Sequence, residues 1–167
     1  MKKKLWSLVV AGLMAVQGAW AASPSLLADG SGLSFEQYSG SQTVGLGQVN
    51  VSNTLFFIDE GIVNGYHSWF IFADSATPST LSAVLQFDQT ILQVYSSTAD
   101  IAATTPVYGA AGVSYGTRGY TGLEGNDSVS WADTFMVLDL RLAGPGDHLR
   151  VLTAVPTAPV PEPASAA

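Results

Sequence analysis

Hydrophobic and polar residues alternate most regularly between residues 80 and 88. Apolar side chains occupy every second position there, and Val84 is the one apolar residue on the polar side. The regular apolar positions are Leu81, Ala83, Leu85 and Phe87. A period of two puts alternate side chains on opposite faces of a strand, so this segment predicts a strand with one buried face. After a short polar break the apolar residues return at 91–95, and we predict a hairpin over residues 80–96.

Other segments have the pattern of short strands. The run 66–73 is apolar on both faces, which is typical of a central strand covered on both sides. Two alternating runs meet near Ala132–Asp133, where the phase of the alternation changes, and this predicts a turn or a bulge. The remaining predicted strands span residues 33–35, 49–58, 129–131, 136–142 and 149–155.

Turn residues separate these runs at 59–61, 64–65 and 144–147. The segment 98–125 has no sustained period, so we expect it to be functional, to be mobile, or to contain a strand that the pattern does not reveal. Helix signals are nearly absent after residue 21. The chain is therefore predicted to be all-β, with a single antiparallel β-sandwich of the jelly-roll kind over residues 22–155.

The first 21 residues have the three-part organisation of a cleavable signal peptide. Lys2–Lys4 form a positive start, residues 5–16 are apolar, and Ala19 and Ala21 are the small residues that precede a cleavage site. The apolar part is shorter than the roughly 20 residues that span a bilayer, which favours a signal peptide over a membrane anchor. We expect cleavage after Ala21 and export to the periplasm, the outer surface or the extracellular space.

Composition limits the functional classes. The chain has 167 residues, no cysteine and a formal net charge of −7. Three of its six basic residues are the leader lysines, so the exported chain has three arginines against 13 carboxylates, a net charge of −10. This argues against nucleic acids and anionic lipids as partners, because both are bound mainly through Lys and Arg. The lack of cysteine excludes disulfides, a thiol nucleophile and cysteine metal sites.

Residues 156–167 form a proline-rich tail, which is typical of extended and exposed chain. Within it, Pro161, Glu162 and Pro163 resemble the head of the PEP-CTERM sorting signal of exported proteins in many Gram-negative bacteria. In that family an apolar helix and an Arg-rich end follow, and an exosortase processes the tag. Neither part follows here, so we expect no stable membrane span in these residues. Two hypotheses stay open, a sequence cut short and an early stop that removed the anchor.

The body of the chain is also similar to a recurrent type of PEP-CTERM protein for which no activity is established. The similar stretches are 85–92, 122–124, 127–129 and 144–156, and the resemblance covers most of residues 66–163. It implies an exported surface or matrix protein, often encoded beside exopolysaccharide production, with an exosortase and exopolysaccharide as partners. We predict a non-enzymatic protein without a cofactor.

Catalytic alternatives each lack part of their pattern. Residues 112–116 fit the G-x-S-x-G pattern of serine hydrolases, but no helical period follows Ser114. Only His67 or His148 could serve as its base, and two histidines are also too few for a zinc site.

Carboxylates in predicted loops are candidate calcium ligands, but none has the EF-hand spacing, and we predict solvated turn residues without a metal. These candidates are Asp29, Asp59, Glu60, Asp127 and Asp133. A glycosidase pair is not indicated either. Asp59 and Glu60 would point to opposite faces of a strand, and Glu124 and Asp127 lie in a loop that holds no fixed separation.

Aromatic residues leave carbohydrate binding as the second hypothesis. Sandwich modules bind sugars by stacking aromatic rings on the sugar face, and the candidates are Tyr108, Tyr115, Tyr120 and Trp131. The competing interpretation is that these rings belong to the core or stiffen a glycine-rich loop. We therefore place first a surface or matrix protein associated with exopolysaccharide or biofilm, second a secreted carbohydrate-binding module, and third a small hydrolase.

Overall fold

The computed structural model describes residues 22–29, 32–75, 77–116, 118–142 and 146–157. The predicted cleavage residues Ala19 and Ala21 and the sorting motif Pro161–Pro163 lie outside these ranges. The described elements are β1 (Ser25–Asp29), β2 (Ser34–Gln37), β3 (Thr54–Val63), β4 (Tyr66–Ala73), β5 (Ser79–Gln86), β6 (Ile91–Tyr95), α1 (Thr98–Tyr108), β7 (Ser128–Ala132), β8 (Phe135–Leu142) and β9 (Asp147–Thr153).

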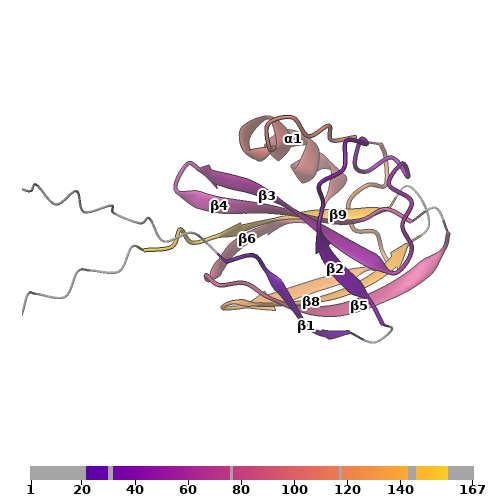
Figure 1. Ribbon diagram of the computed structural model, residues 1–167, viewed down its shortest axis with the longest axis horizontal. Coiled ribbons are helices and arrows are strands. Elements are labelled where there is room, and N and C mark those ends of the chain that lie inside the picture. The colour runs from indigo at the N-terminus through magenta and orange to yellow at the C-terminus, as the bar shows by residue number, and fades with distance from the viewer. Residues whose placement is uncertain (1–21, 30–31, 76, 117, 143–145, 158–167) are drawn as a thin grey trace, which may run out of the picture.

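The strands form two sheets packed face to face, so the prediction of an all-β sandwich is confirmed. One sheet has the order β1-β5-β8-β7 and the other has the order β2-β3-β4-β9-β6. Figure 1 shows α1 on the far side of the five-stranded sheet from the four-stranded sheet. One pairing departs from the predicted antiparallel arrangement, because β2 runs parallel to β3.

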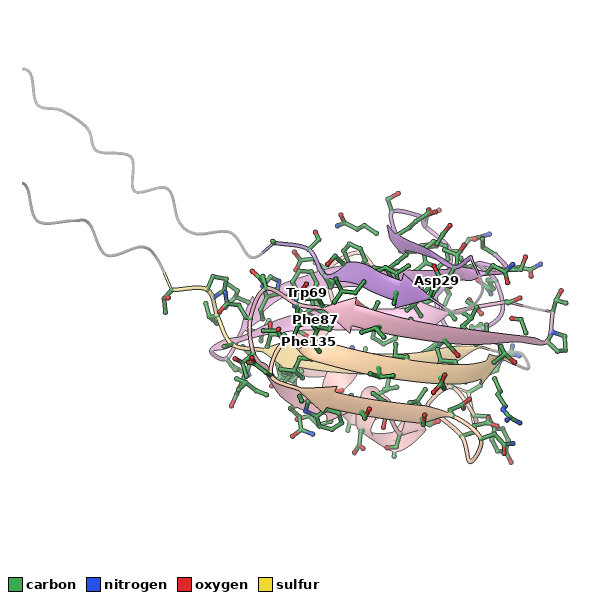
Figure 2. All side chains as sticks on the ribbon, turned by 90° about the horizontal axis from the view of Figure 1, so that it is seen from below. Asp29, Trp69, Phe87 and Phe135 are labelled. Carbon is green, nitrogen blue, oxygen red and sulfur yellow. The ribbon has the colours of Figure 1, made fainter. Side chains whose placement is uncertain are left out.

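The main core fills the space between the sheets. In β8 burial alternates at every residue, since the outer face of the four-stranded sheet is open to solvent, as Figure 2 shows. Trp69 of the opposite sheet contributes the largest ring and contacts Phe87 edge-on, with ring centroids 6.5 Å apart. Both residues are labelled at one end of the sandwich in Figure 2.

A second core covers the outer face of the five-stranded sheet. Strand β4 is buried from His67 to Ala73, as predicted for a central strand. Its odd-numbered residues Trp69 and Ile71 face the main core, whereas Phe70 and Phe72 pack beneath α1 and its neighbouring loops. Because both faces of this sheet are covered, the run from Trp69 to Ala73 in its central strand β4 is apolar on both sides.

The predicted hairpin over residues 80–96 is wrong. Strand β5 pairs with β1 and β8, whereas β6 pairs with β9 in the other sheet. The chain crosses between the sheets at the buried Phe87 and at residues 88–90. The alternation identified both strands correctly, but it contains no information on which strand each of them joins.

The segment 98–125 begins with a helix, which the sequence analysis missed. The Ser97 hydroxyl accepts a hydrogen bond from the Asp100 backbone N–H at 3.1 Å, as an N-terminal cap does. The Ser-x-x-Asp spacing resembles a capping box and was the available signal. Periodicity did not reveal the helix because its only buried apolar residue is Ile101.

The capping contact gives a direct test of α1. We expect Ser97→Ala to lower the free energy of unfolding by about 1 kcal/mol, because an orphan N–H at the helix start loses its acceptor. Ser97→Asn keeps a capping oxygen and is the matched control, with unfolding in urea as the measurement. Equal stability of the alanine and asparagine variants would contradict this role.

Other boundaries differ locally. The Asn64–Gly65 turn joins β3 to β4 with both residues at positive φ, as a two-residue hairpin requires, and a turn at Asp133 follows β7. The predicted turn at 59–61 is instead a bulge inside β3, where the register shifts between Asp59 and Gly61. The strand predicted over 49–58 begins later, at Thr54, and β1 was not predicted.

Candidate functional site

A groove of about 350 Å³ lies on the outer face of the five-stranded sheet beside α1. We call it the tyrosine groove, and its lining residues are Tyr66, Leu92, Gln93, Tyr95, Tyr108 and Leu152. Three of the chain's six tyrosines therefore meet at one place. They come from segments far apart in the sequence, namely two strands and the last residue of the helix.

The register of the sheet explains how these side chains come together. Strand β9 lies between β4 and β6, and its Leu152 pairs with Gln93 while its Arg150 pairs with Tyr95. Directly opposite residues share a face of the sheet, so both pairs face the α1 side, where Arg150 lies beneath the helix. Leu152 forms the floor, and Tyr66 of β4 lies on the other side.

The end of α1 completes the groove, and a buried ion pair holds the helix on the sheet. Arg150 donates from Nε to Glu60 Oε2 at 2.7 Å and from Nη2 to Glu60 Oε1 at 2.9 Å, and both side chains are fully buried. The guanidinium also donates to Thr104 Oγ1 and to Thr105 Oγ1 of α1. Glu60 additionally accepts from Ser68 Oγ at 2.6 Å. The helix that carries Tyr108 is thus anchored through polar contacts.

The groove is electrically neutral near physiological pH. None of the described residues that line it has a charged side chain. Burial raises the pKa of the Tyr108 phenol above its usual value of 10, and the nearby phenols of Tyr95 and Tyr66 raise it further. The Tyr108 phenol is therefore neutral at pH 7.

The lining combines flat apolar faces with polar edges. Tyrosine rings offer an apolar face for stacking and a hydroxyl at the rim, and the Gln93 amide adds a donor and an acceptor. Ligand sites in proteins typically have this composition, with a few polar groups that fix orientation on an apolar surface. A pyranose ring, with apolar C–H faces and equatorial hydroxyls, has the complementary chemistry.

Only one of the four predicted aromatic residues lies in the groove, and that is Tyr108. Tyr115 packs in the second core, edge-on to Phe70 at 4.9 Å, and its hydroxyl accepts from the Ala110 N–H. Tyr120 is 74% exposed in the following loop, and Trp131 lies on β7 of the other sheet. The structure therefore does not bring the four together.

Tyr66 and Tyr95 are the aromatic residues of the groove that sequence reasoning missed. Both are in segments correctly predicted as strands, and each was taken as an ordinary strand residue. The sequence contains no signal that singles them out, because Tyr66 begins one apolar run and Tyr95 ends another. The proximity of Tyr66 to Tyr95 depends on β9 pairing between β4 and β6, which is a long-range property of the sheet.

The described residues do not assemble a serine hydrolase triad. Ser114 Oγ accepts a hydrogen bond from Thr43 Oγ1 at 3.1 Å. His67 Nε2 lies 2.7 Å from Asp59 Oδ1, and the His67 ring stacks on Trp69. His148 is fully buried, and among the residues that the structure describes neither of its ring nitrogens has a hydrogen-bond partner.

The candidate carboxylates serve separate local roles. Asp59 and Glu60 point to opposite faces, as expected, toward His67 and Arg150. Asp133 accepts from Thr90, while Asp127 accepts from the backbone N–H groups of Glu124 and Arg141. Asp29 accepts from the Gly32 N–H. In the described part of the chain, no three His, Cys, Asp or Glu side chains come together as metal ligands.

A second hollow, of about 450 Å³, lies where β5 begins and β8 ends in the four-stranded sheet, and its lining includes Ser79, Glu124, Asp127 and Arg141. Its polar walls differ from those of the tyrosine groove. Both carboxylate oxygens of Asp127 are already bonded to backbone N–H groups, so this side chain serves to hold its turn.

No protein-family model matches this chain, and searches of curated proteins and of solved structures give no significant match either. Among the described residues, no helix has the length and hydrophobicity needed to cross a membrane.

Proposed function

We propose that this protein is exported and acts without catalysis at the cell surface or in the extracellular matrix, where it contacts polysaccharide through the tyrosine groove. The observation that carries the proposal is the convergence of Tyr66, Tyr95 and Tyr108 beside the Gln93 amide. The signal peptide pattern of residues 1–21 and the resemblance of Pro161–Pro163 to a sorting motif support export.

The composition of the groove also supports binding over catalysis. Hydrolysis of a glycosidic bond uses two carboxyl groups on either side of that bond. The groove lining contains neither a carboxylate nor an imidazole among the described residues. A surface that holds a glycan without breaking it suits a matrix component.

A secreted carbohydrate-binding module is the alternative, and the same groove supports it. The two functions differ in the fate of the protein after export. A matrix protein sorted by an exosortase stays with the cells and their exopolysaccharide, whereas a free module enters the medium and binds polysaccharide wherever it meets it.

Fractionation of a Gram-negative culture tests the proposal. The full chain is expressed with its leader, and cells, extracted matrix polysaccharide and medium are probed with an antibody. We expect a product whose mass corresponds to an N-terminus at Ala22, recovered mainly in the polysaccharide fraction. Recovery mainly from the medium would favour the alternative. An uncleaved product inside the cells would overturn export.

A further inference from the structure

We infer that the tyrosine groove selects uncharged polysaccharide and discriminates against chains that carry uronate or sulfate groups. This inference rests on the proposed function, since it names the class of glycan that the same groove takes. Its basis is the distribution of charge in and around the groove together with the stacking surface that the tyrosines provide.

The groove offers an anionic sugar no cation. Of the three arginines of the exported chain, Arg150 is fully buried and forms two hydrogen bonds with Glu60. Arg141 lines the hollow where β5 begins and β8 ends in the other sheet, and Arg118 is exposed in the loop after Tyr115. A carboxylate or sulfate in the groove would lose water without gaining a charged partner, which is unfavourable.

The charge of the whole protein acts in the same direction. With three arginines against 13 carboxylates, the exported chain carries a net charge of −10. Such a field repels polyanions at long range and is screened by salt. An uncharged glycan is not affected by this repulsion, and stacking on tyrosine rings needs no charge.

The dimensions of the groove suit a short stretch of a glycan chain. Its volume of about 350 Å³ is at the small end of ligand pockets. Strands β4 and β6 are separated by β9 alone, so their backbones lie about 10 Å apart at the usual strand spacing. Tyr66 and Tyr95 thus stand on opposite sides of the Leu152 floor, which leaves room for a sugar between them.

Native affinity electrophoresis of the exported chain tests the inference. The gels contain β-glucan, galactomannan or dextran as neutral polymers, and alginate or hyaluronan as anionic polymers. We expect at least one neutral polymer to retard the protein with an affinity at least tenfold greater than that of either polyanion. This affinity should change less than twofold between 20 and 500 mM NaCl and between pH 5 and pH 9, because the lining carries no charge.

Substitutions in the groove show whether the groove is the site that binds the neutral polymer. Tyr66→Ala combined with Tyr108→Ala should weaken the retardation by neutral polymer at least tenfold, while Tyr120→Ala is the matched control and should change nothing. Tyr108→Phe keeps the ring, so it should retain most of the binding. Circular dichroism and thermal unfolding show whether each variant is folded. If the double variant is not folded, Tyr66→Ala alone, at a side chain that is already 37% exposed, should still weaken the retardation by neutral polymer.

Each result has a distinct meaning. Tighter retardation by a polyanion that is lost in the double variant would overturn the charge selectivity and leave the proposed function intact. Retardation by neutral polymer that survives in the folded double variant would overturn the groove as the site. If no polymer of either class retards the protein, polysaccharide binding itself is wrong and the inference falls with it.

Discussion

Replacement of Arg150 by methionine is expected to lower the free energy of unfolding by about 3–5 kcal/mol, because it leaves the Glu60 carboxylate buried without its cation. Both side chains are fully buried, and two hydrogen bonds join them. The guanidinium also lies over the Phe70 ring at 5.3 Å. Urea unfolding followed by tryptophan fluorescence measures the loss.

A double variant separates the cost of the orphaned carboxylate from loss of packing. When Glu60→Leu accompanies Arg150→Met, both charges disappear together, and we expect most of the lost stability to return, because apolar replacement of a buried ion pair is often neutral or stabilising. Arg141→Met removes an exposed arginine and is the control, with an expected change within about 0.5 kcal/mol. A loss below 1 kcal/mol in Arg150→Met would contradict this account.

The Arg150→Met variant also tests whether Arg150 holds Tyr108 in its place in the groove. Arg150 donates to Thr104 and Thr105 of α1, the helix that ends at Tyr108. If the Arg150→Met variant remains folded, its helix α1 still lacks these contacts. Binding of neutral glycan should then weaken, even though Arg150 does not line the groove. We therefore expect Arg150 to act as a positioning residue for Tyr108.

The second large effect is a pair of opposed pH dependences at the start of β9. Burial, together with the smaller effect of the nearby Asp127 and Glu124 carboxylates, raises the pKa of Asp147 from 3.8 to about 7. Between these values the folded protein holds a proton that the unfolded chain has released. The contribution of Asp147 to the free energy of unfolding is therefore largest at acidic pH and falls as pH rises from about 4 to 7.

His148 acts in the opposite direction. Burial lowers its pKa from 6.5 to about 3, and its ring packs against Phe70 and Phe72, and against Gly45, where no side chain larger than hydrogen fits. Between these pH values the unfolded chain binds a proton that the folded protein excludes. The contribution of His148 to the free energy of unfolding is complete above pH 6.5 and is lost as pH falls toward 3.

Between about pH 4 and 6.5, the opposite effects of Asp147 and His148 on the free energy of unfolding nearly cancel. Substitution of one residue should therefore expose the pH dependence that comes from the other. Asp147→Asn should make stability rise with pH in this range by about 1.4 kcal/mol per unit, the slope of one proton. At pH 8 it should be more stable than the parent by on the order of 2–4 kcal/mol, because the parent must ionise a buried carboxyl. In His148→Leu, the free energy of unfolding should instead fall as pH rises over the same range, because only the effect of Asp147 remains.

Urea unfolding at half-unit steps from pH 4 to pH 8 measures these slopes. Parallel profiles of the parent and Asp147→Asn would mean that Asp147 titrates normally. Asp88→Asn is the control, since Asp88 is exposed and accepts from the Ala22 N–H at the other end of the sandwich.

The strands were largely predictable because period-two burial is a local property. Residues 80–87 and 136–142 alternate in the sequence as β5 and β8 alternate in burial. The error at 80–96 has a physical cause, because a short polar break can either reverse the chain within one sheet or carry it to the other. Here Phe87 is buried in the core, and the residues that follow it lead from β5 in one sheet to β6 in the other.

The missed helix has a different cause. Prediction from pattern requires an apolar stripe, but α1 attaches to the sheet through Thr104 and Thr105, whose hydroxyls meet the Arg150 guanidinium. A polar contact face leaves no hydrophobic period in the sequence. The cap at Ser97 was readable, and it is the feature that would have predicted the helix start.

By itself the sequence determined the all-β class, the position of most strands, the exposed turn at Asn64–Gly65 and the separation of Asp59 from Glu60 across a strand. These follow from backbone geometry that acts over a few residues. Only the tertiary structure decided that β9 lies between β4 and β6, and hence that Tyr66, Tyr95 and Tyr108 share one groove. Strand order and the attachment of α1 arise from contacts between residues distant in sequence, which local periodicity does not encode.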